Sequence, residues 1–281
     1  MVVMETTTLS APNYTPRRPI IKSAGVTARC NWTRPIVSVC GLRKTYQTDT
    51  GETVGVKKVS FDVMPGQIVG ILGPEGSGKT TIVECIAGLR QADAGNIRVF
   101  GIDVQADPGR IRDLIGIQFQ ESQLKAEITV AQALELFGSF YPTPASLDNL
   151  ISLLKLDDKR DEPFQSLTHE QRQRLSIALA LIGSPKIAIF DELTSDLSPA
   201  ARQETGKLIE LVRDAGVTII LVTNCLVEVE KLCDQIVVIA DGEVVGRGTP
   251  AQLIAETPGA QTLQDVCTQL TGSPVELCLG A

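Results

Sequence analysis

The residues with the clearest chemical meaning lie in the segment GPEGSGKTT, which runs from Gly73 to Thr81. Its first eight residues match the P-loop pattern G-x-x-x-x-G-K-[ST]. In such a loop, backbone N–H groups wrap around phosphates, and the helix that follows points its positive end at them. An unrelated glycine-rich turn is the alternative, but the strand-like QIVGIL before the loop and the helical IVECIAGL after it favour the P-loop. The sequence therefore predicts binding of a nucleoside triphosphate.

The side chains of this loop have distinct expected roles. We expect Lys79 to bridge the β- and γ-phosphates and the hydroxyl of Thr80 to bind Mg²⁺. The other residues of the loop that we assign to the nucleotide site are Gly73, Pro74, Glu75, Gly76, Ser77, Gly78 and Thr81.

Two acidic residues end the apolar segment KIAIFDE at 186–192. Asp191 stands where P-loop proteins place a carboxylate for Mg²⁺, and Glu192 is placed to polarise an attacking water as a general base. Two acids at the end of a hydrophobic strand usually cap a helix, which is the alternative. Their combination with a P-loop favours the chemical role and predicts hydrolysis of the nucleotide.

Short apolar segments and helical segments alternate around these residues. Strands are predicted for IVSVCGL from Ile36 and for residues 59–63, 67–72, 186–192 and 217–223. Such alternation implies a parallel sheet covered on both faces. Residues 121–183 have an almost entirely helical pattern, which predicts a helical insertion within an α/β core. We divide the chain into a mobile N-terminal extension (1–35), a nucleotide-binding domain (36–250) and a C-terminal helical segment (251–281).

The composition excludes several other classes of protein. The 281 residues are 43% hydrophobic and 21% charged, as in globular chains. A net charge of -7 and 4% aromatic residues disfavour a nucleic-acid partner. The apolar runs are shorter than the roughly 18 residues of a membrane span, the N-terminus lacks a secretory pattern, and the seven scattered cysteines suggest reduced thiols. These features predict a soluble intracellular protein.

Further motifs follow in a fixed order between about Val37 and Gly272. An aromatic residue, Tyr46, lies in LRKTYQ and a glutamine, Gln120, lies in IGIQFQES; QRQRL begins at Gln171, and SDLS spans 195–198. This order resembles that of ATP-binding subunits of ABC transporters. The resemblance implies a P-loop NTPase fold with a RecA-like parallel-sheet core, an antiparallel β portion and an inserted α-helical subdomain. The ending, GEVVGRGTP and TLQDVCTQLTG, resembles the drug- and antibiotic-export branch.

The resemblance also implies ligands, roles and partners. The ligands are ATP and Mg²⁺: Tyr46 would stack on adenine, and Gln120 would act with Glu192 in catalysis and with Thr80 and Asp191 at the metal. Two nucleotide-binding subunits would sandwich two ATP molecules, as a homodimer or a heterodimer. A separate transmembrane permease subunit would bind the helical insertion, which places the chain at the cytoplasmic face of the membrane.

The motif that meets the nucleotide of the opposing subunit is altered. The family's signature motif, L-S-G-G-Q, is here LTHEQ, with Thr168, His169, Glu170 and Gln171 after Leu167. The lost glycines normally let a helix N-terminus approach a γ-phosphate without side-chain obstruction. His169 adds bulk and Glu170 adds negative charge, whereas Thr168 can still donate a hydroxyl. Alternatively, His169 and Glu170 simply begin a helix, where a first-turn glutamate is favourable.

Three further positions depart from the family. Asn224 stands where a histidine contacts the γ-phosphate, and asparagine carries neither charge nor a transferable proton. The segment SDLS at 195–198 stands where the family has its D-loop, and Ser198 replaces the usual aspartate of that loop. Leu193 replaces the proline that usually follows the acidic pair. Binding of ATP is therefore expected to persist while turnover is reduced.

Three hypotheses for the function remain open. The first is the energising subunit of an ABC exporter. The second is a hydrolysis-poor, ATP-dependent clamp that forms the degenerate half of a heterodimer, which the altered signature and Asn224 favour. The third, a soluble ABC-type ATPase of translation or DNA repair, is disfavoured by the single nucleotide domain and the acidic balance.

Overall fold

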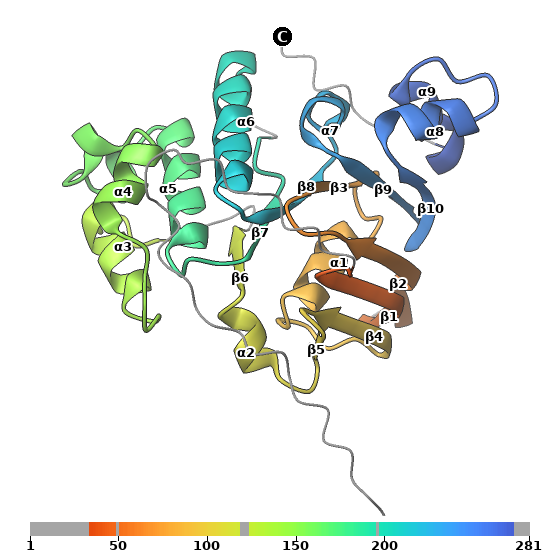
Figure 1. Cartoon of the computed structure of the whole chain (residues 1–281), viewed down its shortest axis with the longest axis horizontal. Helices are drawn as coiled ribbons and strands as arrows, with labels where there is room; N and C mark the ends of the chain where they lie inside the picture. Colours follow the sequence, from red (N-terminus) through yellow and green to blue (C-terminus); the bar gives the residue numbers. More distant parts are fainter. Residues whose placement is uncertain (1–33, 49–50, 119–123, 195–196, 273–281) are drawn as a thin grey trace, which may run out of the picture.

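The computed structural model describes residues 34–48, 51–118, 124–194 and 197–272. Within these residues, one sheet of ten strands runs through the molecule in the order β5-β4-β1-β2-β10-β9-β3-β8-β7-β6 (Figure 1). Gln120, Ser195 and Asp196, like most of the N-terminal extension, lie outside the described residues. No helix of the described ranges is long and apolar enough to cross a membrane.

One end of the sheet is antiparallel. Strand β1 (Val37–Thr48) pairs antiparallel with β2 (Gly51–Val63) on one side and with β4 (Ala94–Val99) on the other. Strand β5 (Ile102–Asp103) continues this portion beyond β4. The apolar segment predicted from Ile36 begins one residue before β1, and the segment predicted at 59–63 lies within β2. Both strands are longer than the predicted segments.

The other end of the sheet is parallel. Strands β3 (Ile68–Leu72), β8 (Thr218–Thr223), β7 (Ile187–Asp191) and β6 (Ile115–Gln118) pair in parallel. Strand β9 (Gln235–Ala240) runs parallel to β3, and β10 (Glu243–Gly248) runs antiparallel to β9. Every residue of β3, β7 and β8 is buried, which explains their continuous apolar sequences.

Helices cover both faces of this parallel portion. Ile68 and Leu72 of β3 pack in one core with residues of α5 (His169–Leu181), α6 (Pro199–Asp214) and α7 (Leu226–Leu232). Val69 and Ile71, which point to the opposite face, pack in a second core with residues of α1 (Lys79–Ile86). The same alternation divides β7 and β8 between the two cores. The expected parallel sheet with two covered faces is confirmed.

The region predicted to be almost entirely helical is less helical than expected. Helices α3 (Val130–Gly138), α4 (Leu147–Leu153) and α5 lie together at one end of the molecule (Figure 1). Irregular chain and two short 3-10 helices, Asp157–Lys159 and Phe164–Ser166, separate them. Pro142, Pro144 and Pro163 lie in these connections, where the missing N–H and fixed φ of proline disfavour a continuous helix.

The remaining helices are short. Helix α2 (Pro108–Arg112) precedes β6, and helices α8 (Pro250–Glu256) and α9 (Leu263–Thr271) follow β10. Both α8 and α9 pack against β10, which lies between β2 and β9, so this part of the chain is joined to the middle of the sheet.

Candidate functional site

The candidate site lies where the carboxyl ends of three neighbouring parallel strands meet. Leu72, the last residue of β3, is in register with Thr223, the last residue of β8. Asp191, the last residue of β7, is in register with Val222 of β8. The carboxyl ends of these strands therefore bring together the P-loop, Asn224 and the pair Asp191–Glu192. Open α/β sheets bind their ligands outside this end of the strands.

The glycines of the P-loop have a steric role. Gly78 has φ +99°, and a Cβ at this position would collide with the carbonyl oxygen of Gly55. Gly78 is also the N-cap of α1, and no side chain in the described part of the chain caps this end of the helix. The first turn of α1 has no acidic residue, so its N–H groups and positive dipole end suit an anion such as a phosphate.

Lys79 is held inside its own loop. The side chain is buried, and Nζ donates to the carbonyl oxygens of Gly73 at 2.8 Å and Pro74 at 2.9 Å. Burial lowers the pKa of Lys79, and nearby carboxylates, above all that of Glu192, oppose this shift. The ammonium group can thus exchange two carbonyl partners for phosphate oxygens without a large movement of its backbone.

Asp191 has the properties of a cation ligand. It is buried, and burial raises the pKa of its carboxyl to about 6, although the hydroxyl of Thr80 donates to it and opposes the rise. In the described parts of the chain, Oδ1 of Asp191 has no hydrogen-bond partner. Buried polar atoms usually have a partner, which can be another protein group, water or an ion. The oxygen of Asp191 and the hydroxyl of Thr80 together fit Mg²⁺.

The rest of a metal shell is not provided by other acidic residues. Among the described residues, no group of three or more His, Cys, Asp or Glu side chains could hold a metal ion. Mg²⁺ typically keeps several waters and binds one or two carboxylates plus substrate phosphates. One carboxylate and one hydroxyl beside a phosphate-binding loop are consistent with that pattern.

Glu192 has an unusual backbone conformation. Its φ is +49°, and its N–H donates to the carbonyl oxygen of Val222 at 2.8 Å. A non-glycine residue in this region of φ/ψ space costs on the order of 1–3 kcal/mol, and such residues cluster at functional sites. Asn224, which is half-buried, follows β8 immediately and precedes Cys225, the N-cap of α7.

Tyr46 lies beside the helix that begins at the P-loop. Its hydroxyl is 2.7 Å from Oγ1 of Thr81, and the guanidinium carbon of Arg90 lies 5.1 Å from the centre of its ring. The structure therefore brings the aromatic residue predicted to stack on a base into contact with the phosphate-binding segment.

The segment LTHEQ, which was predicted to be an altered signature, leads into helix α5. Oγ1 of Thr168 accepts from the N–H of Gln171 at 3.3 Å, and Oε1 of Gln171 accepts from the N–H of Thr168 at 2.9 Å. This reciprocal arrangement is a capping box, and it makes His169 and Glu170 the first residues of the helix. The alternative role proposed for these two residues, that they start a helix, is confirmed.

One residue near the site was not singled out from the sequence. Glu228 of α7 is buried, and its Oε2 accepts from the hydroxyl of Thr223 at 2.8 Å. Oγ1 of Thr223 in turn accepts from the N–H of Cys225 at 2.9 Å, so the turn that carries Asn224 is fixed on both sides. The only signal in the sequence was a glutamate between the apolar residues Val227 and Val229.

These features define a P-loop nucleotide-binding protein. The family model described as "ABC transporter" matches residues 56–195. The chain is 34% identical over 235 residues to Nod factor export ATP-binding protein I of Ralstonia nicotianae, which covers 82% of this chain and 72% of the relative. It is also 34% identical over 228 residues to the protein of the same name from Rhizobium etli, with 79% and 71% covered.

Solved structures have the same fold. An ATP-binding subunit of an ABC transporter superposes with a TM-score of 0.74 at 22% identity, covering 84% of this chain and 99% of that one. A dimeric ATP-binding cassette in a post-hydrolysis state with ADP and Pi superposes with a TM-score of 0.69 at 25% identity, covering 76% and 98%. This chain belongs to the ABC transporter family. It is an ATP-binding cassette, in a family whose members hydrolyse ATP.

Proposed function

We propose that this chain is the ATP-binding subunit of an ABC export system and couples the binding and hydrolysis of Mg-ATP to a separate transmembrane permease. The observation that carries the proposal is the buried Oδ1 of Asp191, which has no hydrogen-bond partner among the described residues and lies next to the hydroxyl of Thr80 at the start of the P-loop helix. The names of the relatives, which are export ATP-binding proteins, support export as the direction. The drug-export branch stays a proposal based on the C-terminal motifs.

The residues of the site have defined roles in this proposal. The N–H groups of the P-loop and Lys79 bind the phosphates, and Glu192 accepts the proton of the attacking water. Thr80 and Asp191, with Gln120, would hold Mg²⁺, which neutralises charge on the β- and γ-phosphates. Asn224 donates a hydrogen bond to the γ-phosphate, and Tyr46 stacks on the base.

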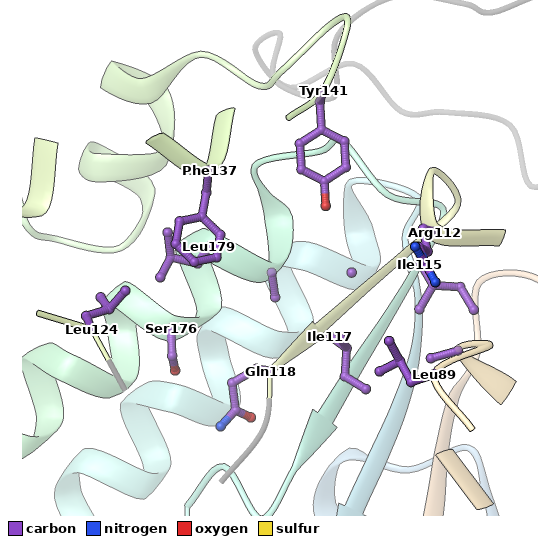
Figure 2. A pocket seen from close by; sticks show the side chains of 13 residues that line it. Leu89, Arg112, Ile115, Ile117, Gln118, Leu124, Phe137, Tyr141, Ser176 and Leu179 are labelled. Carbon is purple, nitrogen blue, oxygen red and sulfur yellow. The ribbon is translucent and has the colours of Figure 1, made fainter. Parts of the chain in front are cut away.

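A groove at the edge of the helical region suits the permease. It has a volume of about 410 Å³. In Figure 2, Ile117 and Leu89 line its sheet side, and Leu124, Phe137 and Leu179 line its helical side. Strand β6, which also borders the groove, leads directly into the segment that contains Gln120. A permease segment bound here would be connected to the predicted catalytic glutamine by one strand.

A second nucleotide-binding subunit completes the proposed assembly. The similar cassette of known structure that is dimeric supports this arrangement. In the dimer, Thr168, His169, Glu170 and Gln171 would face the nucleotide of the opposing subunit. The pair would lie at the cytoplasmic face of the membrane, bound to the permease, with no nucleic-acid partner.

Turnover is proposed to be slow. Glu170 places a carboxylate in the first turn of α5, where the γ-phosphate of the opposing ATP would bind, and Asn224 cannot carry a proton. These two residues favour the second candidate function, a hydrolysis-poor clamp that forms the degenerate half of a heterodimer. A partner could lend its signature to the P-loop of this chain, but it could not replace Asn224.

Binding measurements on the purified full chain test the proposal. We expect wild-type protein to bind ATP more tightly with Mg²⁺ than with EDTA, and Asp191→Asn to remove most of this difference. Asp214→Asn, an exposed aspartate at the end of α6, is the control and should keep it. An Mg²⁺ effect that persists in Asp191→Asn contradicts the assigned metal site, and the absence of ATP binding contradicts the function.

A further inference from the structure

The turn that follows helix α1 holds β1 immediately before Tyr46. The carboxylate of Asp93 accepts from Nζ of Lys44 at 2.7 Å, and from the N–H and hydroxyl of Thr45 at 2.6 and 2.8 Å. The N–H of Asp93 donates to the carbonyl oxygen of Arg43 at 2.9 Å. Three consecutive residues of β1 are thus tied to one aspartate, which lies 48 residues from Thr45 along the chain.

The ring of Tyr46 is fixed on several sides. The guanidinium of Arg90, from the same turn, lies over one face with its carbon 5.1 Å from the ring centre, and its Nε donates to the carboxylate of Glu84. The tyrosine hydroxyl is 2.7 Å from Oγ1 of Thr81. At one ring edge, a Cβ added at Gly55 would lie 2.5 Å from Cε2 of Tyr46, so only a glycine leaves room for the ring there.

A pre-oriented ring is a better platform for a base than a mobile one. Ordering a side chain during binding lowers affinity, and positioning it in advance removes that cost. The guanidinium of Arg90 is held over the ring by Glu84 and makes a cation–π contact with it. Arg90 also takes up one face of the ring, which leaves stacking on a base to the other face.

We propose that Asp93 and Arg90 are positioning residues that hold Tyr46 as the platform for the nucleoside base. Neither residue touches the triphosphate in this account: Asp93 fixes the backbone before Tyr46, and Arg90 fixes its ring. The inference rests on the proposed role of Tyr46 in stacking on the base of ATP. It predicts that the two residues affect binding of the nucleoside part alone.

Calorimetry on the full chain with two ligands, Mg-ATP and inorganic tripolyphosphate with Mg²⁺, separates base from phosphate binding. Asp93→Asn and Arg90→Gln should each weaken ATP binding about threefold to tenfold and leave tripolyphosphate binding unchanged. Tyr46→Ala should do the same, and Asp93→Asn should have no further effect in that background. Asp103→Asn is the matched control, because Asp103 accepts from Asn96 and Gln105 but holds no residue of β1.

The outcomes distinguish this inference from the proposed function. If Tyr46→Ala weakens ATP binding while Asp93→Asn and Arg90→Gln do not, the inference alone is wrong. Equal losses for ATP and tripolyphosphate in both positioning variants also overturn it, because they indicate a general structural role. If Tyr46→Ala leaves the affinity for ATP unchanged, Tyr46 is not the platform for the base. If wild-type protein binds neither ligand, the proposed function is wrong. If Asp93→Asn does not fold, Arg90→Gln carries the test.

Discussion

The hydroxyl of Ser198 donates to Oε1 of Glu170 at 3.3 Å, which joins the first turn of α5 to the N-cap of α6. The resemblance described in the sequence analysis implies that the family usually has an aspartate where this chain has Ser198. It likewise implies a glycine where this chain has Glu170. An aspartate at 198 would place a second carboxylate against Glu170. The two positions are therefore physically coupled within one subunit.

This coupling predicts the effect of Ser198→Asp. Aspartate is as good an N-cap as serine, so the cap of α6 survives and the change mainly adds repulsion with Glu170. We expect a loss on the order of 0.5 kcal/mol in the free energy of unfolding, which is small because the site is exposed and screened by salt.

Urea denaturation of a double-mutant cycle measures this effect. Ser198→Asp should cost less in a Glu170→Gly background, and the difference should shrink in 1 M NaCl. An equal cost in both backgrounds would show that the two positions are independent.

Glu228 should make the stability of the protein depend on pH. Burial raises the pKa of its carboxyl to about 7, although the hydroxyl of Thr223 and the charge of Arg202 oppose this rise. Because the fold favours the protonated form, the stabilising contribution is complete below about pH 4.5 and is lost as the pH rises through about 7. Wild-type protein should therefore lose stability between pH 5 and pH 8, whereas Glu228→Gln has no carboxyl to ionise. The free energy of unfolding of the variant, relative to that of wild type, should rise by on the order of 2 kcal/mol over this range.

Urea denaturation of both proteins at the two pH values tests this prediction. Glu230→Gln, an exposed glutamate of the same helix, is the control and should show no such gain. A stability difference between Glu228→Gln and wild type that is the same at pH 5 and pH 8 would refute the assignment.

Gly78→Ala is predicted to abolish nucleotide binding. The substitution combines a positive φ with a collision against the carbonyl oxygen of Gly55, so the P-loop must shift. Gly216→Ala is a matched control, because Gly216 has φ +94° with no atom within 4 Å of the added Cβ. The control should lose about 1–2 kcal/mol of stability from backbone strain but keep ATP affinity. Calorimetric binding that survives in Gly78→Ala would contradict the steric argument.

Asn224→His tests the cause of slow turnover. Imidazole can carry the charge and proton that asparagine cannot, and Asn224 lies next to Thr223, which Glu228 fixes in place. We expect phosphate release to rise at least severalfold while ATP affinity changes little. An unchanged rate in a complex that already turns over rapidly would show that Asn224 does not limit hydrolysis.

Sequence patterns predicted the parts of this structure that depend on local signals. Strands β3, β7 and β8 were visible because every residue in them is buried, and the P-loop because its glycines, lysine and threonine are close together. The contact of Glu170 with Ser198 and that of Asp93 with Thr45 join residues 28 and 48 positions apart. Such contacts depend on how helices and strands pack, and neither periodicity nor spacing encodes them. The prolines between α3 and α5 were a local signal that the helical periodicity obscured.

Steady-state phosphate release with Mg-ATP, compared between wild type and Glu192→Gln, tests whether this chain hydrolyses ATP with Glu192 as the base. If the chain is an ABC ATPase that uses Glu192 as the base, wild-type protein releases phosphate and Glu192→Gln does not, although both bind ATP. A rate near or below about 0.1 s⁻¹ fits the slow turnover proposed here, since typical enzymes run at about 1–10³ s⁻¹. Equal release from wild type and Glu192→Gln would contradict the role of Glu192 as the base. No release from either protein, with ATP bound, would contradict the motor and leave the clamp.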